Sequence, residues 1–369
     1  MDKVLKAKLV ETISYFDAES RVDFISPIDS GHINDSFLVK LHGGASSYVL
    51  QRINHNIFRN IPGLIDNILI VTIHIEKKLS ENREQGCRFV PLQLVPEISG
   101  LYFYQDNEGN FWRVYKFIEG SKSYERVKNP RLAYEGGKAW GNFQALTSDI
   151  PMDSLVETIP DFHNIDLRIR YFRDAVKNDV INRAGKLAAE IDFVESRAEE
   201  MRTILKLGNA GKLPFRVTHN DTKFNNILFN NNDEAICIVD LDTVMPGFVL
   251  YDFGDAIRTG TNSGNEDESD LDNVTINLQL FEAYSQGYLE MAGDFLSLEE
   301  IRYLAFSAKF MTFIIGLRFL TDYLDGDHYY KIHFDHHNLQ RAKVQFRLLS
   351  EMERNYSAMQ KIIDNHSNA

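Results

Sequence analysis

Short apolar segments of strand length dominate the first 120 residues of the chain. Residues 37–41 and 48–53 predict two strands joined by a turn rich in glycine. Residues 64–79 carry apolar side chains three or four positions apart, which predicts a helix with one apolar face. Two more strand-like segments follow at 89–95 and 111–118. This part of the chain is therefore predicted to form a small β-rich lobe with one main helix.

Beyond residue 120 the spacing of apolar positions becomes helical. Pro130 suits the first position of a helix over 132–146. Ser297-Leu298-Glu299-Glu300 fits a capping box and opens an apolar stripe over 301–315. Three short strand-like runs lie within this helical part, at 215–218, 227–229 and 235–241. We expect an α+β protein of two lobes, with residues 1–118 forming the small lobe and residues 119–369 a larger, mostly α-helical lobe.

Composition narrows the class of protein. The 369 residues include 44% hydrophobic and 25% charged side chains, an ordinary globular balance. A net charge of −13 and the lack of a basic run argue against a nucleic-acid partner. We see no apolar stretch of the ~20 residues that a membrane helix needs and no signal peptide, so we expect a cytoplasmic protein without a membrane partner. Cys237 lies in an apolar run and is expected to be a buried, inert side chain.

The residues that carry chemistry cluster between residues 217 and 242. Asp221, Lys223 and Asn226 lie between two strand segments, and Asp240 follows the next strand. Phosphoryl transfer needs such a set, because it depends on a positioned hydroxyl and on cations that offset phosphate charge. Asp221 could accept the hydroxyl proton, Lys223 could stabilise the moving phosphoryl group, and Asn226 and Asp240 offer oxygen ligands for Mg²⁺. Each residue type is also common in turns, but the joint spacing matches a kinase catalytic loop.

This constellation resembles the aminoglycoside phosphotransferase and choline kinase superfamily, and within it the N-acetylhexosamine 1-kinases. Similar segments run in order from about residue 30 to residue 340. They include Gly31-His32-Ile33-Asn34, the run from Trp112 to Glu119, Asp240-Leu241-Asp242-Thr243, Asp252-Phe253-Gly254-Asp255 and Arg318-Phe319-Leu320. The resemblance implies a bilobal protein-kinase-like fold and an enzyme that uses ATP and Mg²⁺. It further implies that the acceptor is the anomeric hydroxyl of N-acetylglucosamine or N-acetylgalactosamine, without a protein partner.

The resemblance also implies roles for individual residues. Asp221 is expected to be the catalytic base and to contact the substrate, Lys223 to assist catalysis, and Asn226 and Asp240 to bind Mg²⁺. The expected nucleotide-binding residues are Ser30, Gly31, His32, Ile33 and Asn34 over the phosphates, Val49 above adenine, and Phe117 and Ile118 at the hinge. The expected substrate-binding residues besides Asp221 are Asp242, Arg318 and Tyr329.

Two features depart from the protein-kinase pattern. Asp252-Phe253-Gly254 spells the kinase metal motif, but it follows the strand that already ends in Asp240, which argues against a metal role. The resemblance to the superfamily implies instead that Asp252 braces the catalytic loop. Strand alternation puts Gln51 on the same side as Val49, where kinases carry a lysine. Two alternatives therefore stay open: a kinase for choline, ethanolamine or another alcohol, and a nucleotide-binding pseudokinase. An arginine such as Arg318 facing the pocket disfavours a cationic acceptor.

Overall fold

The computed structural model describes residues 3–17, 21–28, 33–44, 47–81 and 89–367, which divide into two compact units. Unit 1 comprises Met1–Ser123, Asp149–Ile159 and Asn225–Met245, and unit 2 comprises Tyr124–Ser148, Pro160–Phe224 and Pro246–Ala369. This division differs from the single cut after residue 118 that the sequence suggested. The reason is that the segment 225–245 returns to unit 1, where the backbones of Lys122 and Phe229 pair and Val90 N–H donates to the carbonyl of Ile236.

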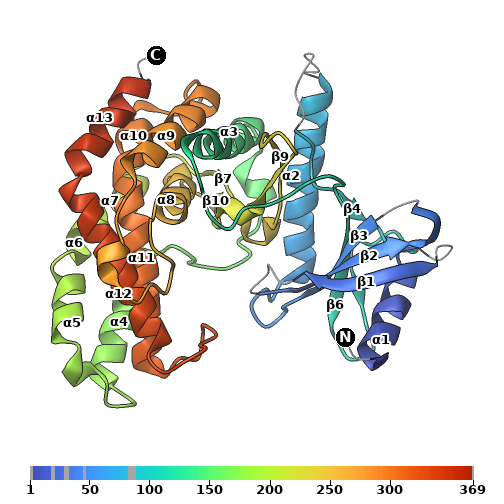
Figure 1. The fold of residues 1–369 in the computed structure, drawn as a ribbon, viewed down its shortest axis with the longest axis horizontal. Helices are drawn as coiled ribbons and strands as arrows, with labels where there is room; N and C mark the ends of the chain where they lie inside the picture. The colour runs from blue at the N-terminus through green and yellow to red at the C-terminus, as the bar shows by residue number, and fades with distance from the viewer. Residues whose placement is uncertain (1–2, 18–20, 29–32, 45–46, 82–88, 368–369) are drawn as a thin grey trace. The chain divides into compact units, whose positions relative to one another are not determined.

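Unit 1 is built on an antiparallel sheet in the order β1-β2-β3-β6-β4, with β5 also paired to β6 (Figure 1). Its helices and strands are α1 (Lys3–Ser14), β1 (Val22–Ile28), β2 (Asp35–Leu41), β3 (Ser47–Ile53), α2 (Ile61–Glu81), β4 (Leu94–Val95), β5 (Tyr104–Gln105), β6 (Phe111–Lys116), β8 (Ile227–Phe229) and β9 (Ala235–Ile238). The predicted strands at 37–41, 48–53 and 111–118 and the predicted helix at 64–79 are confirmed. The predicted strand at 89–95 is wrong over most of its length, because Pro91 cannot donate to a ladder and only Leu94–Val95 pairs.

The two faces of this sheet have different surroundings. One face packs on α1, a helix that the sequence reading missed, through Leu9, Phe37 and Leu50 among other buried apolar residues. Because side chains alternate along a strand, Gln51 on β3 and its partner Arg113 on β6 lie on the opposite face. The sheet therefore has an apolar side covered by α1 and a second side that carries polar groups.

Unit 2 is mostly helical. Its helices and strands are α3 (Pro130–Thr147), α4 (Ile165–Asn178), α5 (Ala188–Glu195), α6 (Ala198–Met201), α7 (Thr203–Asn209), β7 (Arg216–Thr218), β10 (Met245–Gly247), α8 (Val249–Gly260), α9 (Leu278–Ala292), α10 (Leu298–Arg302), α11 (Leu304–Asp325), α12 (His337–Arg354) and α13 (Tyr356–Ser367). Asn129 caps α3 ahead of Pro130, and Ser297 and Glu300 form the predicted capping box. The helix expected over 301–315 is broken at Tyr303 into α10 and α11.

Helix α11 lies at the centre of unit 2 and packs against α4, α8 and α12 (Figure 1). By length and composition it is the one described helix that could cross a membrane, which corrects the expectation that no such segment exists. Its central window is 83% buried inside the protein, so the all-round apolar surface is explained by its place in the core.

Helices α3 and α9 approach closely enough that backbone touches backbone. A Cβ atom on Gly137 would lie 2.1 Å from the carbonyl oxygen of Tyr284, and one on Gly287 would lie 2.2 Å from that of Tyr134. Only glycine fits at these two positions. The contact holds α3 in place, and α3 carries Gln144, whose side chain donates to Asp252, the residue that holds the catalytic segment described below. The α+β class expected from the sequence is thus confirmed.

Candidate active site

The segment that follows β7 in unit 2 is held by the side chain of Asp252 on α8. The two carboxylate oxygens of Asp252 accept hydrogen bonds from the backbone N–H groups of His219 at 2.8 Å and Asn220 at 2.7 Å. Gln144 Nε2 donates to the same carboxylate, and Thr222 Oγ1 donates to the carbonyl of Asp252. Asp252 is 1% exposed, and this burial raises its pKa to about 7. The predicted bracing role is confirmed.

Asp221 forms an ion pair with Lys223 in the braced segment. Lys223 Nζ lies 2.9 Å from Asp221 Oδ1, and the two side chains are 35% and 28% exposed. Burial would raise the pKa of Asp221, but the Lys223 charge and hydrogen bond outweigh it and hold that pKa below its ordinary value. The Asp221 charge in turn raises the pKa of Lys223. The structure therefore keeps a partly accessible carboxylate ionised beside a permanent cation.

The two expected Mg²⁺ ligands lie at one end of a hairpin in unit 1. Strands β8 and β9 pair Ile227 with Ile238, and the next hydrogen bond runs from Val239 N–H to the carbonyl of Asn226. This register places Asn226 and Asp240 beside each other where the hairpin ends. Asp240 is exposed and has φ 60°, a left-handed conformation that costs about 1–3 kcal/mol for a residue other than glycine. An amide oxygen and an accessible carboxylate are hard donors, so this pair fits a Mg²⁺ ion that phosphates and water also ligate.

A buried arginine occupies the polar face of the sheet where the sequence reading found no lysine. Arg113 on β6 is fully buried, its Nη1 lies 2.5 Å from Asp242 Oδ1, and its Nε donates to Gln51 Oε1 at 3.0 Å. The other oxygen of Asp242 accepts from Asn34 Nδ2 at 2.6 Å. Burial would lower the pKa of Arg113, but the facing Asp242 carboxylate raises it. The guanidinium is therefore charged, and both Asp242 oxygens are engaged within unit 1.

Sequence reasoning missed Arg113 although it lies inside a segment that we had compared with other kinases. The available signal was an arginine flanked by apolar residues in a central strand, Phe111-Trp112-Arg113-Val114-Tyr115. Helix α2 carries a buried polar side chain, Asn67, which is 1% exposed. Asn67 Nδ2 donates to the carbonyls of Val156 and Val244 at 2.8 Å each, which ties α2 to the segment after Asp242.

The expected nucleotide-binding residues are only partly described. Ser30, Gly31 and His32 lie outside the described residues, whereas Ile33 is exposed and Asn34 is bonded as above. Val49 shares the Gln51 face of β3, as predicted.

At the expected hinge, Phe117 already donates its N–H to the carbonyl of Ser47, whereas within the described part of the chain Ile118 N–H has no partner. Ile118 is thus the hinge residue whose backbone donor is available for a base.

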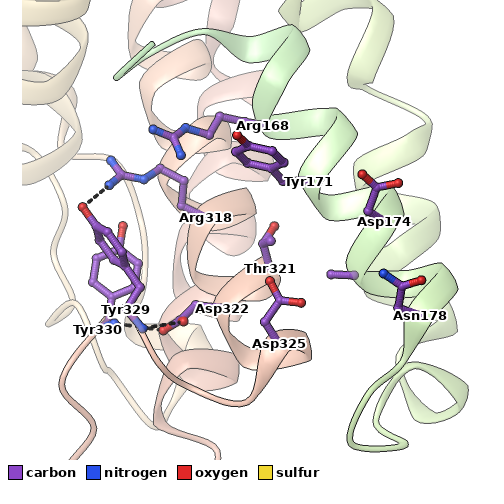
Figure 2. Close-up of a pocket in the computed structure, with 11 residues that line it drawn as sticks. Arg168, Tyr171, Asp174, Asn178, Arg318, Thr321, Asp322, Asp325, Tyr329 and Tyr330 are labelled. Carbon is purple, nitrogen blue, oxygen red and sulfur yellow. Dashed lines mark hydrogen bonds between the residues drawn. The ribbon is translucent and has the colours of Figure 1, made fainter. Parts of the chain in front are cut away.

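Arg318 and Tyr329 meet at a cavity of about 440 Å³ within unit 2, between α4 and α11 (Figure 2). Arg318 Nη2 donates to Tyr329 Oη at 3.3 Å, and its guanidinium lies over the Phe162 ring at 5.0 Å. The neighbouring His163 is buried, and burial together with Arg318 and Arg168 lowers its pKa to about 3. The charge of Asp221 acts on the pKa of the same imidazole in the opposite direction, so Arg318 and Asp221 both lie within electrostatic reach of His163.

Comparison with solved structures identifies the fold. The chain superimposes on the microcompartment-associated aminopropanol kinase with a TM-score of 0.65 at 14% identity, covering 96% of this chain and 98% of the other. It superimposes on an ethanolamine kinase of Plasmodium vivax with a TM-score of 0.54 at 18% identity, covering 87% and 82%. For a spectinomycin phosphotransferase in complex with ADP and spectinomycin, the TM-score is 0.56 at 12% identity over 98% of each chain.

These likenesses show the protein-kinase-like fold that the sequence led us to expect. A family model described as the phosphotransferase enzyme family, APH, matches residues 25–293, well over half of the sequence and including Asp221, Asn226 and Asp240. The chain therefore belongs to the APH phosphotransferase enzyme family.

Proposed function

We propose that this phosphotransferase transfers the γ-phosphoryl group of ATP to the anomeric hydroxyl of N-acetylglucosamine or N-acetylgalactosamine and releases the sugar 1-phosphate and ADP. The observation that carries this proposal is the Arg318–Tyr329 hydrogen bond at the wall of the unit 2 cavity. A guanidinium and a phenol offer fixed donors to sugar oxygens, and the aromatic rings beside them suit the apolar face of a sugar. We propose the cytoplasm, where ATP is made available, as the compartment.

In this reaction Asp221 takes the proton from the anomeric hydroxyl, which then attacks the γ-phosphorus while the bond to the β-phosphate oxygen breaks. Lys223 keeps Asp221 ionised and adds positive charge near the transferred group. Asn226 and Asp240 would hold Mg²⁺, which when bound offsets the charge of the phosphates. Asp252 keeps the segment that carries Asp221 in one conformation.

A cationic alcohol such as choline or ethanolamine is the second candidate acceptor. It is favoured by the carboxylates of Asp174 and Asp325 and by the tyrosines that line the same cavity. It is opposed by the two guanidinium groups, Arg168 and Arg318, at the other end.

Release of ADP, measured with Mg·ATP across N-acetylglucosamine, N-acetylgalactosamine, choline, ethanolamine and aminopropanol, tests these candidates. Turnover of an N-acetylhexosamine, followed by detection of the sugar 1-phosphate by phosphorus NMR, is the expected result. Turnover of an amino alcohol alone would overturn the proposal. Binding of Mg·ATP without transfer to any acceptor would assign the chain to the pseudokinases.

A further inference from the structure

The cavity between α4 and α11 is lined by a second arginine, Arg168, which has no role in the proposed sugar binding. Arg168 on α4 and Arg318 on α11 present their guanidinium groups side by side at one end of the cavity (Figure 2). Arg168 Nη2 donates to the carbonyl of Phe162 at 2.9 Å, while its Nε is buried and has no hydrogen-bond partner among the described residues. Over the same residues, neither arginine forms an ion pair with a carboxylate.

Two adjacent guanidinium groups without a counter-charge repel each other. Burial is the largest cause that lowers the pKa of Arg168, and the Arg318 charge is the next. Arg168 nevertheless remains charged at neutral pH, because the ordinary pKa of a guanidinium lies far above 7. An anion bound between the two arginines would relieve this repulsion, since carboxylates and phosphates accept the forked donors of arginine.

The carboxylates of the cavity do not neutralise this end. Asp322 accepts the backbone N–H groups of His328, Tyr329 and Tyr330 and is therefore committed to the loop that carries the tyrosines. Asp174 and Asp325 lie toward the opposite end (Figure 2). A ligand with one anionic group would thus enter in a single orientation, with that group attracted to the arginines and repelled from the acidic end.

We propose that the acceptor of this enzyme is an N-acetylhexosamine whose exocyclic C6 is either oxidised to a carboxylate or bears a phosphate, and that Arg168 and Arg318 bind this anionic group. The inference rests on the proposed function, because it takes the cavity beside Arg318 as the acceptor pocket. It adds Arg168 as a specificity residue that contacts the substrate away from the reacting hydroxyl.

The test compares three acceptors in the ADP-release assay: N-acetylglucosamine, its 6-phosphate and N-acetylglucosaminuronic acid. We expect KM for the better anionic acceptor to be about tenfold lower than for the neutral sugar, the effect of one net charged hydrogen bond. The KM values for the 6-phosphate and for the uronic acid show whether the site prefers a phosphate or a carboxylate. Equal or weaker use of both anionic sugars would overturn the proposal.

Variants assign the effect to the cavity. Arg168→Gln should abolish the KM difference between anionic and neutral acceptors, and Arg168→Lys should keep part of it because the charge remains but the fork is lost. Arg170→Gln, two residues along α4 and outside the cavity lining, is the matched control and should leave both KM values unchanged. If the ratio of KM for the neutral acceptor to KM for the anionic acceptor were unchanged in Arg168→Gln, Arg168 would not be the residue that binds the anion.

Thermal unfolding without ATP separates this inference from the proposed function. N-acetylglucosamine 6-phosphate or inorganic phosphate should stabilise the wild-type protein and the Arg170→Gln control but not Arg168→Gln. If no N-acetylhexosamine is phosphorylated, the proposed function fails, yet this stabilisation would still support the anion site. If neither N-acetylglucosamine 6-phosphate nor inorganic phosphate stabilised the wild-type protein, the proposal of an anion site would be overturned.

Discussion

Removing the buried cation Arg113 should destabilise unit 1 far more than removing an exposed arginine from the same sheet. Arg113→Met keeps the length and apolar stem of the side chain but leaves Asp242, which is 3% exposed, without its ion-pair partner. Breaking a buried ion pair by removing one partner typically costs about 3–5 kcal/mol. Asn34 Nδ2 still donates to Asp242, so we expect the free energy of unfolding to fall by about 3 kcal/mol, the lower end of that range.

Arg52 provides the matched control. It lies on β3, pairs with Asp35 at the surface, and both side chains are about half exposed. Such a pair contributes about 0–1 kcal/mol, so Arg52→Met should change the unfolding free energy by no more than that. The measurement is urea-induced unfolding at pH 7, followed by circular dichroism, with each variant compared with the wild type.

The double variant Arg113→Met/Asp242→Leu separates loss of charge pairing from loss of packing. It removes both charges, so it should be more stable than Arg113→Met alone even though two residues have changed. Activity should be low in the double variant, because Asp242 also connects Asn34 to the segment after Asp240. If Arg113→Met were no more destabilising than Arg52→Met, or if the double variant were the less stable one, our reasoning about a buried charge at Asp242 would be refuted.

Four further outcomes test the catalytic assignments. Asp221→Asn should lower kcat by about 10²- to 10⁴-fold with little change in KM, because the amide keeps the shape of the base but cannot take a proton; steady-state kinetics with near-wild-type kcat would remove Asp221 as the base. Lys223→Ala should lower kcat and shift the acidic limb of the kcat/KM–pH profile to higher pH, since burial then raises the pKa of Asp221 against only the weaker effects of His219 and Arg258. An unshifted limb would contradict the ion pair. Asp240→Asn should raise the Mg²⁺ concentration needed for half-maximal activity and be partly rescued by added Mg²⁺, and an unchanged Mg²⁺ titration would move the metal site elsewhere. Asp252→Asn should lower the free energy of unfolding by about 1–3 kcal/mol, because the amide N–H₂ group of asparagine would face a backbone N–H donor. It should also lower kcat. A lower kcat with unchanged stability would argue for a direct catalytic role of Asp252 instead.

Local sequence was sufficient where neighbours in the chain determine the structure. The capping box at Ser297 follows from residue types at short spacing. The bracing of residues 219 and 220 by Asp252 spans more of the chain and was expected from the family resemblance. The short segment from Asp221 to Asn226 was likewise sufficient to identify the reaction class. Its residues lie close together in the chain, between two strands.

Tertiary structure decided what depends on residues that are distant in the chain. Arg113 and Asp242 are 129 positions apart, and only the pairing of β6 with β3 and the return of residues 225–245 to unit 1 bring them together. Arg168 and Arg318 likewise lie beside each other only because α4 packs on α11. A charged side chain in a sequence does not show whether it is solvated or buried, and burial makes the electrostatic energy of these groups large enough to matter. For this protein the reaction class could therefore be inferred from the sequence, whereas the buried cation Arg113 and the two arginines of the unit 2 cavity required the packed chain.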